Sequence, residues 1–139
     1  MHRAPLLQLV ESYKIKYLAE TETVSKYKDF VIANENCFER SLLEGHITCG
    51  AWILDGSGTK TLLTHHRKLN RWLQLGGHAD GDHDVHRVAA KEAQEESGIS
   101  TLELVSKDIF DIDIHKIPPR GDVPSHLHYD ARFLFRTTN

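Results

Sequence analysis

The sequence predicts an α/β domain built on a mixed sheet. Two segments in the first forty residues carry apolar side chains at helical spacing. From residue 47 onward, short apolar or alternating segments are bounded by clusters of glycine, proline and aspartate, as is typical of strands. A glycine pair then leads into a third helical segment, which is rich in glutamate. A chain of 139 residues is long enough for one domain with a substantial core.

The first elements are helices. We expect residues 1–43 to form a helical extension that packs on a domain spanning residues 44–139. One helix is predicted from Pro5 to about Leu18, since proline is accepted in the first turn. A second is predicted from about Thr23 to Asn34. The residues with helical spacing in the two segments are Leu6, Leu9, Val10, Tyr13, Tyr17, Val24, Tyr27, Phe30 and Val31.

Strands and turns follow along the chain. The first two strands are joined by a turn at residues 55–58, and the last two by a turn at residues 118–121. The glutamate-rich helix is expected to begin at a cap supplied by Asp82 or Asp84 and to end at Gly98. The predicted strands cover residues 47–54, 61–65, 73–75, 102–106, 109–117 and 127–136.

The glutamate-rich helix indicates a metal site. Glu92, Glu95 and Glu96 share one face, where like charges repel by a few tenths of a kcal/mol per pair. At about 100° per residue they fall beside Val85 and Val88, so the carboxylates extend the apolar stripe. A solvated acidic face, the usual meaning of a charge run, would lie opposite the valines. Carboxylates turned inward should be paired or bound to a metal, and an oxygen-only site suits Mg²⁺ or Mn²⁺.

The segment from Gly77 to Ile99 resembles the Nudix box of the Nudix hydrolase family, and the likeness covers about residues 44–136. His83 stands where the box has its first glutamate, and Lys91 stands where it has arginine. In the family these two positions brace the site, and lysine lacks the planar fork of arginine. The residues that match the box in register are Gly77, Glu92, Ala93, Glu95, Glu96, Gly98 and Ile99.

The resemblance implies a fold and a ligand set. The fold would be the Nudix α/β/α sandwich. The metal ligands would be Glu92, Glu95, Glu96 and the backbone carbonyl of Gly76, with Mg²⁺ or Mn²⁺ as the cofactor. Glu92 is the candidate for the general base. The base varies in the family, so three other carboxylates stay open, although plain surface polarity is the other interpretation for each: Glu103, Asp111 and Asp113.

The resemblance also implies something missing. Nudix domains continue with another strand and a helix that covers the second face of the sheet, whereas this sequence ends at Asn139. We therefore expect the C-terminal part of the usual domain to be absent. An uncovered face would be an exposed apolar patch. Either the N-terminal helices or a second copy of the chain, in a homodimer, would cover it.

Substrate-binding residues are predicted around the glycine pair. Gly77 and His78 lie next to the metal-binding helix. The basic residues just upstream could meet substrate phosphates or form only a solvated turn: Arg67, Lys68 and Arg71. Trp72 could stack on a base, although a tryptophan beside a strand is more often part of the core. The pair Gly76-Gly77 could also form only a turn.

Histidines are frequent, and two of them share a strand face. His126 and His128 are two residues apart, so their side chains point the same way. We expect them to line the substrate cleft and to donate hydrogen bonds to phosphate. A zinc site with His115 as a further ligand is the alternative. Polar surface or loop packing is the only assignment for His65, His66 and His86.

The expected function is hydrolysis of a diphosphate linkage in a nucleoside diphosphate joined to another group, with water as the nucleophile. A Nudix-fold nucleotide-binding or regulatory module whose catalysis has decayed is the alternative, and a pure scaffold is a third. A net charge of −3 argues against bulk nucleic acid or a membrane as partner, but not against a small charged ligand. A cytoplasmic protein with reduced thiols at Cys37 and Cys49 is expected, with a disulfide as the alternative.

Overall fold

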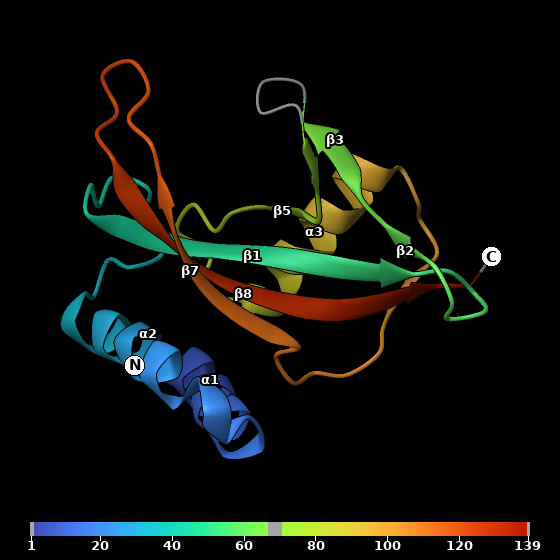
Figure 1. Cartoon of the computed structure of the whole chain (residues 1–139), viewed down its shortest axis with the longest axis horizontal. Coiled ribbons are helices and arrows are strands. Elements are labelled where there is room, and N and C mark those ends of the chain that lie inside the picture. The colour runs from blue at the N-terminus through green and yellow to red at the C-terminus, as the bar shows by residue number, and fades with distance from the viewer. Residues whose placement is uncertain (1, 67–70, 139) are drawn as a thin grey trace.

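The structure, a computed structural model, describes residues 2–66 and 71–138 (Figure 1). The helices are α1 (Ala4–Lys16), the short 3-10 helix η1 (Leu18–Glu20), α2 (Thr21–Ala33) and α3 (Val85–Ser97). The strands are β1 (Gly45–Leu54), β2 (Thr61–Leu62), β3 (Thr64–His66), β4 (Arg71–Leu73), β5 (Leu75–His78), β6 (Leu102–Leu104), β7 (Asp111–Ile117) and β8 (His126–Thr137).

The predicted α/β class with a mixed sheet is confirmed. β1 runs parallel to β8 over ten residue pairs, from Gly45 opposite Leu127 to Leu54 opposite Arg136. β2 and β5 pair antiparallel with β1, while β6 and β7 pair antiparallel with β8. The two long parallel strands therefore form the centre of the sheet, and the short strands form its margins (Figure 1).

Two of the predicted strands are wrong in extent. The strand expected at residues 61–65 is divided, because β2 pairs with β1 whereas β3 pairs with β4 in a separate two-stranded sheet. The strand expected at residues 73–75 is likewise divided at Gln74, between β4 and β5. The glycine pair was expected in a loop, but it lies inside β5, where Gly76 faces Gly50 and Gly77 faces Cys49 of β1.

The two faces of the sheet differ in what covers them. Side chains alternate along a strand, so Ile47, Tyr129 and Phe133 point to one face, here called the helix face. His46 and His128 point to the opposite face, here called the open face. The core residues of the sheet all lie on the helix face and pack with the three α-helices: Ile47, Cys49, Ala51, Ile53, Leu75, Ile112, Ala131, Phe133 and Phe135.

The N-terminal helices pack on the same face as α3. The ring of Phe30 in α2 stacks on Tyr129, with centroids 3.8 Å apart and planes 4° apart. His86 of α3 contacts Phe133 further along the same face, at 4.6 Å between centroids. The alternative in which these helices cover the second face is therefore wrong. Within residues 2–66 and 71–138 no helix covers the open face, and the homodimer stays a prediction.

The cysteines and the lengths of the helices can be compared with the sequence prediction. Cys37 and Cys49 are both buried free thiols, as expected, and no disulfide joins them. In the part of the chain that the structure describes, no helix has the length and apolar character needed to cross a membrane.

Local signals fix both ends of α3. The Asp84 side chain accepts a hydrogen bond from the backbone N–H of Arg87 at 3.2 Å, so Asp84 is the N-cap. Asp82 supports this turn by accepting from the Asp84 N–H and from the Arg87 guanidinium. Gly98 ends the helix in the left-handed region, with φ at 71°. The sequence prediction of these boundaries is confirmed.

Replacing Gly98 should lower stability through backbone strain alone. A Cβ at Gly98 would have no neighbour within 4 Å, so no steric clash contributes. We expect Gly98→Ala to lower the free energy of unfolding by about 1 kcal/mol, because a β-carbon is disfavoured at positive φ. Gly98→Asn should lower it less, since asparagine tolerates this region. Urea denaturation measures both, and equal stability of the alanine variant and the wild type would contradict the assignment.

Candidate functional site

The close approach of α3 to β5 defines the first part of the site. A Cβ at Gly77 would lie 2.6 Å from Cδ of Glu92, so only glycine leaves room for this carboxylate. A Cβ at Gly76 would lie 2.8 Å from the carbonyl oxygen of Cys49. The glycine pair therefore serves close packing on both sides of β5, and the alternative that it forms only a turn is wrong.

The three glutamates differ in their surroundings. Glu92 is half-buried, whereas Glu95 and Glu96 are exposed. Glu96 accepts a hydrogen bond from the backbone N–H of Gly76, with Oε1 at 3.1 Å from the nitrogen. Burial raises the pKa of Glu92 above its ordinary value, and the charges of Glu96 and Glu95 raise it further. Lys91 acts in the opposite direction.

This arrangement fits a hard divalent cation. The glycine at position 77 leaves a cradle for the Glu92 carboxylate, and two further carboxylates stand on the same helix within the last turn. Oxygen donors with net negative charge suit Mg²⁺ or Mn²⁺. A bound cation would also offset the repulsion that raises the pKa of Glu92.

The two departures from the Nudix box have different environments. The ring of His83 lies 5.8 Å from that of His2 and 6.4 Å from that of Phe38, between centroids. His83 therefore packs with the N-terminal part of the chain. Lys91 is exposed and places its positive charge near Glu92.

One ion pair near Glu92 had no signal in the sequence. The Arg40 guanidinium donates two hydrogen bonds to Asp80, each at 2.7 Å. The charge of Glu92 contributes to raising the pKa of Arg40, after the larger effect of the hydrogen bond to Asp80. Arg40 belongs to the predicted N-terminal extension, and no motif marked it.

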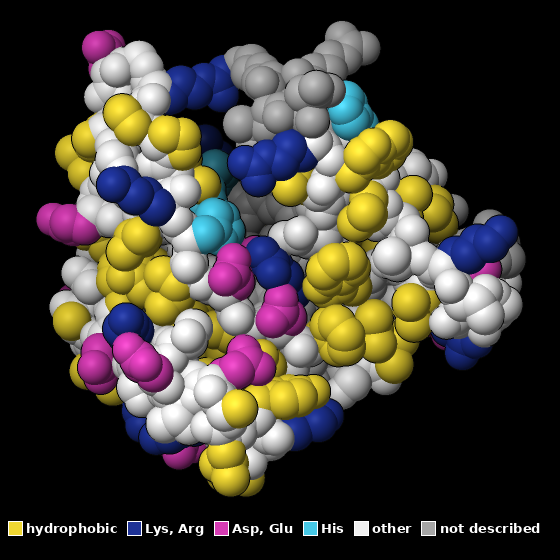
Figure 2. Space-filling model, in the orientation of Figure 1, with side chains coloured by type: hydrophobic (Ala, Val, Ile, Leu, Met, Phe, Trp, Pro, Cys, Tyr) yellow, Lys and Arg dark blue, Asp and Glu magenta, His cyan; other side chains and the backbone are white. Residues whose placement is uncertain are grey.

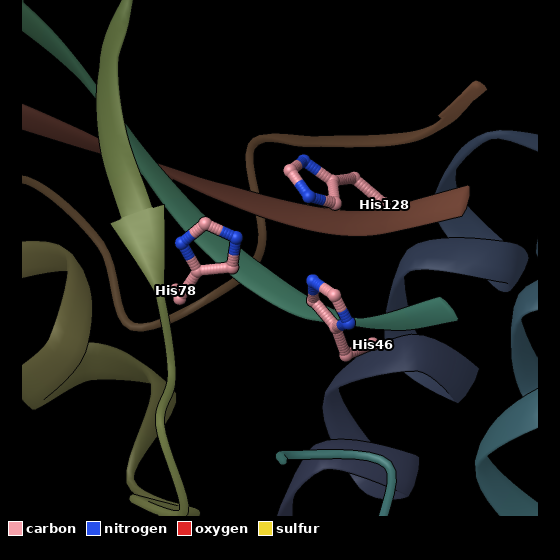
Figure 3. Close-up of side chains that lie close together, drawn as sticks. All are labelled: His46, His78 and His128. Atoms are coloured by element: carbon pink, nitrogen blue, oxygen red, sulfur yellow. The ribbon is translucent and has the colours of Figure 1, made fainter. Parts of the chain in front are cut away.

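A second cluster, formed by histidines, lies on the open face. His46 of β1, His78 of β5 and His128 of β8 point toward one another from three strands (Figure 3). Each offers a nitrogen, and these nitrogens all lie within 4.8 Å of one another. Among the described residues they are the one group of histidine, cysteine or carboxylate side chains that meets this spacing. No motif in the sequence marked His46 as a site residue.

Two more histidines border this cluster. The Nε2 atoms of His126 and His128 are 3.3 Å apart, and the ring of His115 lies 5.4 Å from that of His128. Burial lowers the pKa of His128 to about 3 and that of His78 to about 4, with further lowering by neighbouring histidines and, at His78, by Arg40. Burial also lowers the pKa of His46. These three rings are therefore neutral at pH 7, which weakens them as phosphate-binding groups.

A network of charged groups continues along the open face. Arg132 donates to Asp111, Asp113 and the buried Asp130, at 2.7, 3.3 and 2.9 Å. Thr48 donates to Asp130 at 3.1 Å. In the orientation of Figure 1, α3 lies behind β1. Figure 2 shows the near side, where histidine, acidic and basic side chains gather at the lower edge of a hollow.

The other residues considered in the sequence, mainly as substrate-binding residues, do not gather in one place among the described residues. Arg67 and Lys68 lie outside the described residues. Arg71 is exposed on β4, and Trp72 beside it is 66% exposed, so the expectation that Trp72 belongs to the core is wrong. His65 contacts the Trp72 ring, and His86 contacts the carbonyl of Lys107 at 2.7 Å as well as packing on Phe133. Nothing is described of the His66 side chain.

The three carboxylates that were alternative candidates for the general base lie away from the glycine pair. Asp111 and Asp113 form ion pairs with Arg132, which holds both carboxylates on the open face, away from α3. Glu103 is exposed on β6, opposite Arg136 of β8. Glu92 is the candidate base that lies against the glycine pair.

Two solved structures are similar to this chain. One is the Ap4A hydrolase of C. elegans, with 22% identity, a TM-score of 0.42, and coverage of 63% of this chain and 67% of the other. The other is a NUDIX-family hydrolase of Clostridium perfringens, with 22% identity, a TM-score of 0.45, and coverage of 66% and 69%. No family model matches the chain, and no curated protein matches it significantly. Similarity at this level says nothing about activity, so function depends on the site.

The ionised carboxylate of Glu92 should lower the free energy of unfolding at neutral pH. The pKa of Glu92 is higher in the folded chain than its ordinary value of 4.5, so the folded state favours the protonated form. Its contribution is thus most favourable below pH 4.5 and is lost as pH rises through the folded pKa. We expect Glu92→Gln to raise the free energy of unfolding at pH 7 without divalent ions, and to change it little at pH 4. Urea denaturation at both pH values measures this, with the exposed Glu35→Gln as the control.

The two glycines should respond differently to alanine. In Gly77→Ala the new Cβ meets the far end of the flexible Glu92 side chain, which can rotate away. In Gly76→Ala it meets the backbone of Cys49 and Gly50. We expect Gly76→Ala to lower the melting temperature and Gly77→Ala to change it less but to abolish its increase by Mg²⁺. A full Mg²⁺ effect in Gly77→Ala would contradict the close contact.

Proposed function

We propose that this chain is a metal-dependent, Nudix-type pyrophosphohydrolase that cleaves the diphosphate linkage of a nucleoside diphosphate joined to another group. The observation that supports this is the position of Glu92. Its half-buried carboxylate lies against Gly77, with two more glutamates on the same helix face and its pKa raised. Repulsion among these carboxylates is unfavourable in the metal-free chain, and a bound divalent cation would offset it.

The proposed chemistry assigns a role to each group. Glu92, Glu95, Glu96 and the carbonyl of Gly76 would hold Mg²⁺ or Mn²⁺. When bound, the cation neutralises phosphate charge and polarises phosphorus. Water attacks phosphorus, the bond from phosphorus to the bridging oxygen breaks, and two phosphorylated fragments leave. Glu92 is the proposed base that accepts the proton of the water, because its carboxylate lies against Gly77 at the proposed metal site.

The substrate contacts remain proposals. Arg71 is an exposed cation on β4, and Gly77 adjoins the glutamates. Arg67 is retained as a proposed phosphate contact. Among the described residues β5 pairs only with β1, and Glu96 accepts from the Gly76 N–H of β5. The proposed ligand would bind beside this strand and reach both faces of the sheet. Such a ligand would contact the histidines predicted to bind substrate: His78, His126 and His128.

A nucleotide-binding or regulatory module without catalysis is the second candidate. The environments of His83 and Lys91 favour it. His83 packs with His2 and Phe38, and an imidazole there replaces the bracing carboxylate of the Nudix box. Lys91 supplies charge without the planar fork of arginine. Both candidates would bind a small nucleotide derivative.

Turnover separates the two candidates. Purified protein is assayed with Mg²⁺ or Mn²⁺ against dinucleotides, nucleotide sugars and nucleoside triphosphates. We expect hydrolysis of at least one diphosphate-linked compound, with kcat/KM lowered by about 100-fold or more in Glu96→Gln. Loss of an outer-shell partner alone already costs about 10–100-fold in metal sites. Exposed Glu35→Gln, which lies outside the glutamate-rich helix, should keep full activity.

Thermal stability gives an independent test of metal binding. Mg²⁺ should raise the melting temperature of the wild type but not of the Glu95→Gln, Glu96→Gln double variant. An equal shift in both proteins would remove the basis for this site. Tight binding of a nucleotide without turnover would support the module and exclude the enzyme.

A further inference from the structure

A second kind of metal site is suggested by the spacing of the histidine rings on the open face. The centroids of His46, His78 and His128 form a nearly equilateral triangle with sides of 5.1, 5.1 and 5.0 Å. On a tetrahedral zinc ion, with Zn–N of about 2.0–2.1 Å, neighbouring imidazole centroids would lie about 5 Å apart. The rings thus have the spacing of zinc ligands, and small rotations would turn their nitrogens inward.

Hydrogen bonds at Nδ1 of His46 and of the neighbouring His126 leave the Nε2 atom of each ring, here called the inner nitrogen, as an acceptor. Nδ1 of His46 lies 3.3 Å from the carbonyl of Leu42, and Nδ1 of His126 lies 2.9 Å from the carbonyl of Pro124. A carbonyl can only accept, so each Nδ1 carries the hydrogen and each Nε2 is left as an acceptor. An outer partner of this kind orients the ring of a metal-bound histidine.

One inner nitrogen has no partner. Nε2 of His46 is buried, and no described polar group forms a hydrogen bond with it. His46 is only 4% exposed, so water does not readily take that place. A buried polar atom without a partner is costly, and a metal ion at the centre of the triangle would satisfy it.

A fourth ligand is at hand in His126. Its ring centroid lies 4.9 Å from that of His46 and 5.1 Å from that of His128. Its Nε2 is 3.3 Å from Nε2 of His128. Two nitrogens on one tetrahedral zinc ion are about 3.4 Å apart.

The positive charge of Arg40 near the histidines would oppose binding of a cation. It is offset by the carboxylate of Asp80, which accepts two hydrogen bonds from Arg40.

We propose that His46, His78 and His128, with His126 as the fourth ligand, bind a transition-metal ion of the zinc class. The site differs from the glutamate site in chemistry and position. Imidazole nitrogens favour Zn²⁺, Co²⁺ or Ni²⁺, whereas the carboxylates of α3 favour Mg²⁺. Gly77 faces α3 on the helix face, and the next residue, His78, faces the open face, so β5 separates the two sites.

Cobalt provides a direct readout that needs no activity and no variant. Protein treated with EDTA and then dialysed is titrated with Co²⁺, and visible absorption is recorded. We expect an intense tetrahedral absorption band that saturates at one equivalent and is removed by one equivalent of Zn²⁺. Absence of the band together with no heat of Zn²⁺ binding in calorimetry would overturn the proposal.

Variants locate the ion. His46→Gln, His78→Gln and His128→Gln should each weaken Zn²⁺ binding by at least about tenfold, measured by competition with a chromophoric chelator. His65→Gln on β3, outside the cluster, should leave affinity unchanged. Equal loss in this control would contradict the site. Circular dichroism confirms folding, and in a variant that does not fold, the wild-type cobalt titration decides.

The glutamate site must be excluded as the source of the band. The double variant Glu95→Gln, Glu96→Gln should keep the full cobalt band and the Zn²⁺ stoichiometry. Loss of the band in this variant, with its retention in the histidine variants, would place the ion on α3 and overturn the proposal. Failure of nucleotide hydrolysis leaves this result unaffected, because only metal binding is measured.

Discussion

The parallel pairing of β1 with β8 is the constraint on which the polar architecture depends. Its register places His46 opposite His128, Thr48 opposite Asp130 and Gly50 opposite Arg132. A slip of one residue would exchange the two faces and bring this polar set into the core against the helices. The apolar residues on the helix face therefore hold the histidines and the aspartate network in place.

Much of this fold could be predicted from the sequence, because long periodic segments carry strong signals. Both N-terminal helices, the two long strands and the ends of α3 follow from apolar spacing and from capping residues such as Asp84 and Gly98. The short strands around Gln74 could not be separated, because a change of pairing partner leaves no trace in local composition. The face chosen by α1 and α2 depends on tertiary packing alone.

Site residues that are close together in the sequence could be predicted, whereas those brought together by the sheet could not. The glutamates of α3 lie within five residues, so helical geometry places them together. His46, His78 and His128 lie on three strands, and their meeting depends on sheet register. One signal existed: polar residues alternate in Asp111–His115 and again in His126–Arg132, which predicts strands with one polar face. Only the register shows that these faces coincide.

The alternation along β5 explains why two ligand chemistries can coexist within a few residues. Gly77 has no side chain, so α3 approaches closely and its carboxylates gather at the edge of the strand. His78 points the other way and joins imidazoles from β1 and β8. A larger residue at 77 would displace the Glu92 carboxylate without altering the histidines. A change of register between β1 and β8 would instead break the histidine cluster and leave α3 in contact with β5. The two sets of donors therefore depend on different parts of the fold.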